Sequence, residues 1–331
     1  MVDFVMSVRG VSGGAFDETV GATRFLIVPD NVDPAPVKEQ IRRPADWYAQ
    51  VIANGKWTND DGKERGDILF IVHGYNTSVA EAMSRHRQIK QGLAANHFKG
   101  VVVSFDWPCG TDALAYLVDR HRAKMTAFKL VDDGIWQLSA RQTPDCPINI
   151  HVLGHSTGAY VIREAFDDAD DSQVPHSAWL VSQILFAAGD VSVGSMSEGD
   201  SGARSIYQHC VRLTNYSNSN DAVLDISNIK RAGIAPRVGR IALSDEAPAN
   251  ACNVDCTEYY ALYAGDPSIP IADGPETVAG AQSHSWYFGN AIFTADLFQT
   301  VIGFPSSPRT TRATGRDGKL HLVRQPGAPA V

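Results

Sequence analysis

The chain has 331 residues, 44% of them apolar and 20% charged, which is the composition of a globular protein and excludes a disordered chain. The formal net charge of −8 argues against a general nucleic-acid binder. No apolar run reaches the roughly 18 residues of a transmembrane helix, and the start, MVDFVMSVRG, is typical of a strand and not of a signal peptide.

A β-hairpin is predicted at the beginning of the chain. Two strand-like runs, Phe4–Gly10 and Thr23–Pro29, flank a glycine-rich stretch. That stretch does not match the G-x-G-x-x-G dinucleotide motif, and a strand follows it where the motif needs a helix, so we expect a turn between two antiparallel strands. The segment from Pro29 to Gly66 is polar and contains prolines, with one short helix expected around Pro44–Ala53.

From residue 67 onward, buried-type strands alternate with helices. Apolar strands without polar alternation, separated by helices, indicate a parallel sheet with helices on both faces. We therefore predict an α/β fold with the hairpin as an antiparallel edge. The strands are expected at Asp67–Gly74, Gly100–Pro108, Ile148–His155, Trp179–Asp190, Val211–Asn218 and Tyr259–Gly265. The helices are expected at Thr77–Ala95, at Asp112–Arg141 with a break near Asp132, at Thr157–Ala169 and at Trp286–Ile302.

Two segments are expected to lie outside this alternation. Gly194–Ser205 is rich in glycine and serine and is predicted to be a mobile loop after a strand. The tail, Pro305–Val331, holds one short strand-like piece, GKLHLVR, and either packs on the body or stays mobile.

The most informative motif is Gly154-His155-Ser156-Thr157-Gly158, where an apolar run ends and a helical pattern begins at once. Where a strand turns sharply into a helix, neighbouring backbone comes close, and only glycine fits two residues before and after the serine. The turn then presents the serine hydroxyl at the carboxyl edge of the sheet and at the positive end of a helix. We therefore predict that Ser156 is a nucleophile and not an ordinary turn residue.

A serine hydroxyl is a poor nucleophile near neutral pH, so it needs a general base, and the base needs an orienting carboxylate. In this architecture the chain order is serine, acid, histidine. The histidine best placed to act as the base is His284, because it follows the last predicted strand and precedes the final helix. The other later histidines are His176, His209 and His321.

Three aspartates are candidates for the acid. Asp221 follows the strand VRLTNYSN and is the preferred one, because a carboxylate at that strand end can reach the imidazole. Asp190 ends the preceding strand and is the alternative. Asp225 is expected to sit a turn into the following helix.

A tetrahedral intermediate also needs hydrogen-bond donors for its oxyanion. The backbone N–H of Thr157 is one predicted donor, and the N–H of Tyr75, in the loop after the strand DILFIVHG, is the other. The residues predicted to contact the substrate are Gly74, Asn76, Trp107 and His155. For Trp107, an anchoring role in the core is an equal alternative.

These motifs resemble those of the α/β-hydrolase superfamily, of the esterase and lipase type. The segments FIVHGYNTSVAEA, VVVSFDWP, VLGHSTGAYVIREA and FAAGDVS are similar to a group of bacterial hydrolases with HGYN or HGFN after one strand, a strand ending in W-P and a G/A-H-S-x-G elbow. The resemblance covers about residues 67–302. It implies a mostly parallel sheet of about eight strands, with Ser156 as nucleophile, His284 as base and Asp221 or Asp190 as acid.

Two departures concern the substrate preference. Thr157 stands where that group often has methionine, and Gly189 stands where it often has proline before the strand-end aspartate. Thr157 adds a hydroxyl beside the predicted oxyanion site, so the preference of the group is not carried over to this chain.

We predict a single domain over residues 1–304, with the hairpin and connecting segment at 1–66, a catalytic core at 67–302 and a tail at 305–331. The predicted activity is hydrolysis of a small-molecule carboxylic ester through an acyl-enzyme, with no cofactor. The same residues would serve a thioesterase, lactonase, amidase or acyltransferase. The alternative from another class is a hydrolase-fold binding or scaffold protein without turnover. The sequence leaves the oligomeric state open.

The cysteines argue against a secreted disulfide scaffold, because five of them occur at irregular spacing. Cys252 and Cys256 form a lone C-x-x-x-C, which favours a local disulfide or two plain loop cysteines over a zinc site. We therefore expect a cytoplasmic protein without a metal site. The remaining cysteines are Cys109, Cys146 and Cys210.

Overall fold

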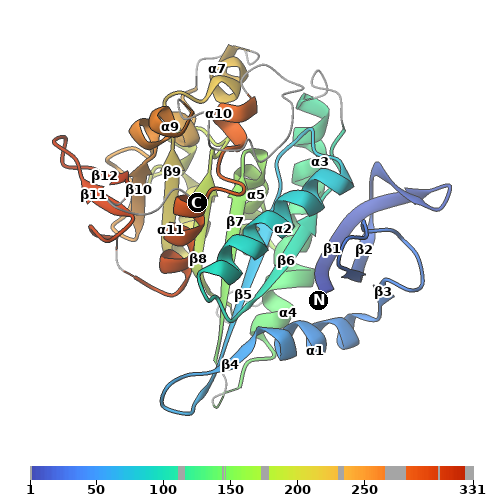
Figure 1. Cartoon of the computed structure of the whole chain (residues 1–331). Coiled ribbons are helices and arrows are strands. Elements are labelled where there is room, and N and C mark those ends of the chain that lie inside the picture. The colour runs from blue at the N-terminus through green and yellow to red at the C-terminus, as the bar shows by residue number, and fades with distance from the viewer. Residues whose placement is uncertain are drawn as a thin grey trace.

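A twisted sheet runs through the molecule in the computed structural model (Figure 1), which describes residues 2–110, 116–143, 145, 147–172, 179–229, 235–264, 281–304 and 306–324. The strand order is β11-β12-β10-β9-β8-β7-β5-β6-β1-β2-β3, with β4 paired to β5. The strands are β1 (Val2–Ser12), β2 (Ala15–Pro29), β3 (Ile41–Arg42), β4 (Lys56–Thr58), β5 (Glu64–Val72), β6 (Val101–Asp106), β7 (Ile148–His155), β8 (Val181–Ala187), β9 (Cys210–Ser217), β10 (Ala251–Asp255), β11 (Arg312–Thr314) and β12 (Leu320–Leu322).

The sheet is mostly parallel, which confirms the predicted α/β class. All neighbours from β12 through to β1 pair in parallel, whereas β2, β3, β4 and β11 each pair antiparallel to their neighbours. With twelve strands, the sheet is larger than the eight or so that were predicted. The extra strands are short pieces at its edges and at the beginning of β5.

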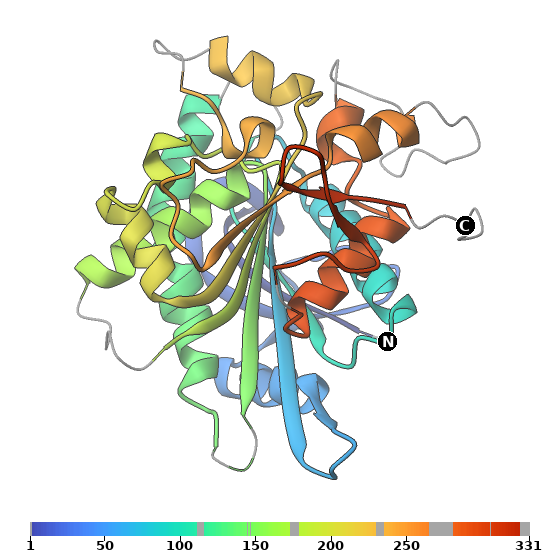
Figure 2. The same ribbon diagram turned by 90° about the vertical axis from the view of Figure 1, so that its left-hand side faces the viewer.

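Helices cover both faces of the sheet (Figure 2). Along β5, alternate side chains enter different cores: Phe70 packs in one cluster with α1, α3, α5 and α6, and Leu69 packs in the other with α2, α9 and α11. The helices are α1 (Pro44–Gly55), α2 (Val79–Ala95), α3 (Tyr116–Lys129), the π-helix η1 (Leu130–Ile135), α4 (Trp136–Ser139), α5 (Thr157–Asp171), the 3₁₀-helix η2 (Gly194–Met196), α6 (Ser201–Gln208), α7 (Ala222–Ile229), α8 (Val238–Ile241), α9 (Thr257–Ala264), α10 (Ala281–Ser285) and α11 (Ala291–Val301). No helix within the described ranges is long and apolar enough to cross a membrane.

The predicted N-terminal hairpin forms, with a tighter turn than expected. Its strands extend to Gly13 and Gly14, which have φ angles of 59° and 82°. Glycine adopts such positive φ values without the steric cost that other residues meet. The other edge of β1 pairs in parallel with β6, so the hairpin is part of the main sheet.

The predicted strand at Tyr259–Gly265 is wrong. Residues 257–264 form α9, and the strand of this region is β10, which the prediction missed. Tyr259, Tyr260 and Tyr263 are buried, and their i, i+1, i+4 spacing is that of one helix face. Cys252 therefore lies in a strand and not in a loop, and the described cysteines are all unpaired.

Two further segments differ from the predictions. The expected break near Asp132 is a π-helical turn that connects α3 to α4, while the beginning of that predicted helix, residues 112–115, lies outside the described residues. The expected loop Gly194–Ser205 contains η2 and the first turn of α6. Arg163 holds this segment, since its guanidinium donates to the Ser195 carbonyl at 3.1 Å and to Asp200 at 2.6 Å.

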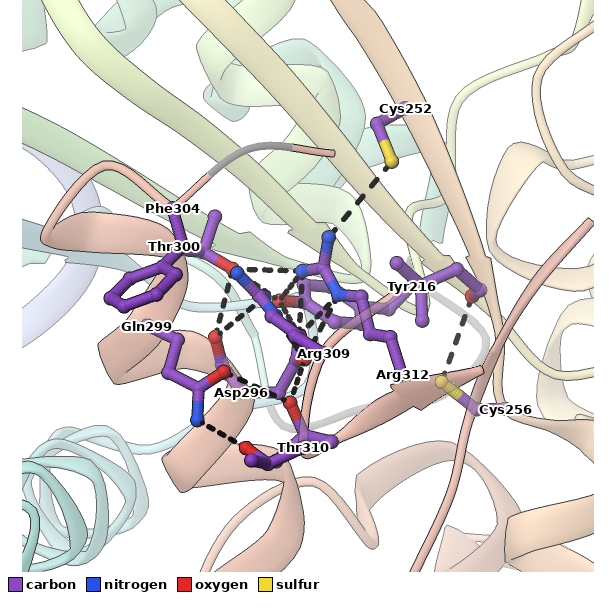
Figure 3. A network of polar contacts seen from close by, with 12 residues as sticks. Tyr216, Cys252, Cys256, Asp296, Gln299, Thr300, Phe304, Arg309, Thr310 and Arg312 are labelled. Atoms are coloured by element: carbon purple, nitrogen blue, oxygen red, sulfur yellow. Dashed lines mark hydrogen bonds and ion pairs between the residues drawn. The ribbon is translucent and has the colours of Figure 1, made fainter. Parts of the chain in front are cut away.

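The described part of the C-terminal tail packs on the body, because β12 pairs with β10 and β11 pairs with β12. A buried network anchors this hairpin (Figure 3). Arg312 of β11 donates to both oxygens of Asp296 on α11, at 2.9 and 2.6 Å, and to the Tyr216 hydroxyl of β9 at 3.1 Å. Burial alone would raise the pKa of Asp296, but Arg312, Arg309 and Thr311 together outweigh burial and lower it.

Replacing Arg312 with methionine is expected to lower the free energy of unfolding by about 3 kcal/mol, because it leaves a buried carboxylate with less compensation. Arg309 still contacts Asp296 at 2.9 Å, which keeps the loss near the low end of the usual range. Urea denaturation measures the change. The control is Arg43→Met, which breaks an exposed ion pair with Asp46 and should change the free energy of unfolding far less. Equal losses in the two variants would contradict the expectation.

Candidate active site

The carboxyl ends of β5 and β7 meet where the strand order reverses. The chain passes from β5 to β6 on one side and later to β7 on the other side. In open α/β sheets, ligands bind in the crevice at such a point. Gly74 follows β5 and Ser156 follows β7, and a Cβ atom on Gly74 would lie 2.9 Å from the Ser156 Cβ. The two motifs predicted to cooperate are therefore in direct contact.

Ser156 occupies a strained turn between β7 and α5. Its φ of 54° and ψ of −123° lie in a region that residues with a side chain rarely adopt. Two hydrogen bonds hold the turn: the Ser156 N–H donates to the carbonyl of Ala187, and the Asp190 N–H donates to the carbonyl of Ser156, each at 3.0 Å.

The flanking glycines are required by close packing, as the motif predicts. A Cβ on Gly158 would lie 2.1 Å from the carbonyl oxygen of Val72, and a Cβ on Gly154 would lie 2.6 Å from the Ile162 side chain. Backbone atoms of β5 cannot move away without breaking the sheet. The sequence around the serine therefore permits the sharp turn, and the neighbouring strands enforce it.

His284 lies in α10 and is hydrogen-bonded to Asp221, which follows β9. The distance from His284 Nδ1 to Asp221 Oδ2 is 2.7 Å, and both residues are buried. Because the carboxylate of Asp221 accepts a hydrogen bond from Nδ1, the neutral imidazole of His284 carries its proton on Nδ1 and has a lone pair on Nε2. Figure 1 shows α10 and α7 together above the strand ends.

The loop that contains Asp221 is fixed on two sides. The second carboxylate oxygen of Asp221, Oδ1, accepts a hydrogen bond from the Leu224 N–H at the beginning of α7, at 2.9 Å. Asn218 Nδ2 donates to the Ser283 carbonyl at 3.1 Å, next to His284. The carboxylate and the imidazole are therefore held by their own backbone segments as well as by each other.

His155 was predicted to contact the substrate, but the structure buries it behind His284. Its Nε2 donates to the carbonyl of His284 at 3.0 Å, and the two ring centroids are 4.8 Å apart. Burial, His284 and Arg85 together hold the pKa of His155 well below its usual value. The ring is therefore neutral and supports the His284 backbone.

Asp190, the alternative acid, has other partners. Its carboxylate lies 3.1 Å from Arg237 Nε and accepts from the Thr157 hydroxyl at 3.5 Å. Asp225 carries an exposed ion pair with Arg240 at 3.4 Å. Of the three aspartates considered from the sequence, Asp221 is the one that is hydrogen-bonded to His284.

The two predicted oxyanion donors are next to residues of the elbow: Thr157 follows Ser156 in the chain, and Tyr75 follows Gly74, which contacts Ser156. Thr157 is fully buried and is the first residue of α5. The first N–H groups of a helix have no acceptor within the helix, so the Thr157 N–H can donate to a bound oxyanion. Tyr75 follows Gly74, and its half-buried ring packs against the core. Asn76 has a φ of 52°, which turns the loop back toward α2, the helix whose first turn is closed by a capping box at Ser78.

Trp107 has no exposed surface, so we assign it to the core and not to a substrate wall. Its indole N–H donates to the His73 carbonyl at 2.8 Å, and the two rings stack with an interplanar angle of 8°. Sequence reasoning also missed the buried partners Arg9 and Asp106 near this position, since no local pattern indicates them. Among the described residues, no group of histidines, cysteines and carboxylates is arranged to hold a metal ion.

The sheet topology and the strand-end serine together define an α/β hydrolase. Residues 51–261 match the model of the family described as "Alpha/beta hydrolase of unknown function (DUF900)", and because the match covers more than half of the chain, this protein belongs to that family. The match begins after the N-terminal hairpin and ends before α10. No curated protein matches the chain.

Several solved structures are similar at low identity. A monoacylglycerol lipase of Paleococcus ferrophilus shares 12% identity over 74% of this chain and 96% of its own, with a TM-score of 0.36. The thioesterase RedJ of Streptomyces coelicolor shares 13% identity over 67% of this chain and 84% of its own, with a TM-score of 0.33. We draw nothing about the substrate from these likenesses, because the identities and TM-scores are low.

Proposed function

We propose that this protein is a serine hydrolase that cleaves carboxylic esters through an acyl-enzyme, with Ser156, His284 and Asp221 as its triad. The observation that carries the proposal is the buried 2.7 Å hydrogen bond between Asp221 and His284, since His284 contacts His155, the residue before the strained turn at Ser156. A strained backbone at a strand end is stable only where its surroundings enforce it, and such strain gathers at functional sites.

In the proposed reaction, Nε2 of His284 removes the hydroxyl proton as Ser156 Oγ attacks the ester carbonyl. Asp221 keeps the proton of His284 on Nδ1 and stabilises the imidazolium that forms. The N–H groups of Tyr75 and Thr157 bind the negative oxygen of the tetrahedral intermediate. The intermediate then breaks its bond to the alcohol, which takes the proton from Nε2. Water repeats the sequence on the acyl-enzyme and releases the acid.

A fluorophosphonate probe tests this proposal, because it reacts with activated serines. Intact-mass measurement of the labelled wild type should show one adduct, and peptide mapping should locate the adduct on Ser156. An ester panel of increasing acyl length would then define the substrate class. No adduct on folded protein, or an adduct on another residue, would contradict the proposal and favour a binding protein without turnover.

A further inference from the structure

A buried polar cluster connects the middle of β1 to the carboxyl ends of β5 and β6, and it contacts the loop of residues 74–77. Arg9 Nε and Ser7 Oγ each donate to the carboxylate of Asp106 at 2.7 Å. The family match begins at residue 51, so the β1 members of the cluster lie outside it. The cluster members are each no more than 3% exposed: Ser7, Arg9, His73, Asp106 and Cys109.

The cluster fixes a peptide unit of the proposed oxyanion site. The carbonyl of Gly74 and the N–H of Tyr75 belong to one planar trans peptide and therefore point in opposite directions. His73 Nδ1 donates to the Gly74 oxygen at 2.8 Å. Because the carbonyl is held toward the cluster, the Tyr75 N–H points in the opposite direction, away from the cluster.

The hydrogen bond from His73 holds in both protonation states of its ring. Burial alone would lower the pKa of His73, but Asp106 and Cys109 together outweigh burial and raise the pKa to about 9. Below that pH, Nε2 can donate to Asp106 Oδ1, which lies 3.3 Å away. Above it, Nε2 can accept from the Trp107 amide at 3.2 Å. Nδ1 keeps its proton in either state.

Arg9 also holds the far end of the same loop. Its Nη2 donates to the Thr77 carbonyl at 3.1 Å, and the Cys109 thiol donates to the same oxygen at 3.1 Å. The planar guanidinium donates in several fixed directions at once, a geometry that the compact ammonium of lysine does not reproduce. Arg9 therefore connects both ends of the loop to the N-terminal hairpin.

We propose that Arg9 is a positioning residue for the Tyr75 N–H, acting directly through Thr77 and indirectly through Asp106 and His73. This inference rests on the proposed function and assigns the N-terminal hairpin a part in the same active site. An oxyanion donor binds charge that develops only in the transition state. A misdirected Tyr75 N–H therefore lowers kcat and leaves KM nearly unchanged.

The test compares Arg9→Lys with Arg312→Lys. Arg312 belongs to a second buried Arg–Asp network (Figure 3), which is built from α11, β9 and β11 and not from the loop of residues 74–77. Titration with the fluorophosphonate probe counts reactive serines, so kcat for a p-nitrophenyl ester is obtained per labelled site. We expect Arg9→Lys to lower this kcat by about 10- to 100-fold, less than the roughly 10²- to 10³-fold of deleting a donor. Arg312→Lys should leave it unchanged, although both variants lower the melting temperature.

Asp106→Asn is the second variant, in case Arg9→Lys does not fold. It keeps the shape of the side chain, weakens the hold on Arg9 and His73, and should lower kcat per labelled site with little change in KM. Equal kcat per labelled site in all three variants would overturn the inference and leave the proposed function intact. Absence of label on Ser156 in the wild type would overturn the proposed function, and the role of Arg9 with it.

Discussion

Ser156→Ala is expected to lower kcat for ester hydrolysis by on the order of 10⁶-fold, because removal of the nucleophile disables the whole triad and not one hydrogen bond. The substitution removes a single buried oxygen, so the elbow and its backbone hydrogen bonds should remain. Initial rates with p-nitrophenyl esters at saturating substrate measure the effect.

Ser182→Ala is the matched control for this variant. Ser182 lies near the beginning of β8, at the amino-terminal end of the parallel strands, whereas Ser156 lies at their carboxyl end. The Ser182 hydroxyl donates to Asn149 at 3.1 Å. We expect wild-type kcat in the control and equal melting temperatures in both variants. A Ser156→Ala enzyme that keeps more than about 1% of wild-type kcat would show that another group is the nucleophile.

Asp221→Asn should lower kcat by on the order of 10⁴-fold, whereas Asp190→Asn should keep it within about 10-fold. An amide at position 221 no longer keeps the proton on Nδ1 of His284 and no longer stabilises the imidazolium. Asp190 contacts Arg237 and Thr157 instead, so asparagine at position 190 disturbs the surroundings of Ser156 but does not change the charge beside His284.

The two asparagine variants are matched, since each neutralises one buried strand-end carboxylate. Measuring kcat and the melting temperature for both separates a catalytic role from a folding defect. Collapse of kcat in Asp190→Asn alone would reverse the assignment of the acid. Collapse in both, with unchanged melting temperatures, would mean that Asp190 also acts on the reacting groups.

The sequence predicts the elbow well because its determinants are local. The glycines at 154 and 158 flank the serine at fixed spacing in one strand–turn–helix unit, although the contact that requires Gly158 is with Val72 of the neighbouring strand β5. The apolar runs of β5, β7 and β8 follow from burial on both faces. The choice between Asp221 and Asp190 could not be made in this way, because both residues follow strands and the rotation of α10 decides which one meets His284.

Long-range contacts account for what the sequence did not reveal. Arg9 and Asp106 are 97 residues apart, and neither stands in a motif that indicates the other. The burial of His155 and Trp107 depends on α10 and on His73, so the motif identifies these residues without saying which way their rings face. The tyrosines of the run YYALYA have helical spacing, but a short apolar run also fits a strand, and packing against the aromatic cluster around Trp286 decides in favour of a helix.

The parallel pairing of β1 with β6 also constrains the order in which the chain folds. Phe4 lies opposite Val103, so β1 leaves the ribosome about a hundred residues before its partner strand β6 exists. The hairpin with β2 forms locally, but the edge of β1 that later meets β6 stays unpaired. Residues 3–10 of β1, which are buried in the finished sheet, are not yet covered at that stage. Open apolar strand edges promote association between chains. The interval before β6 emerges is therefore the period in synthesis when this protein is most exposed to aggregation.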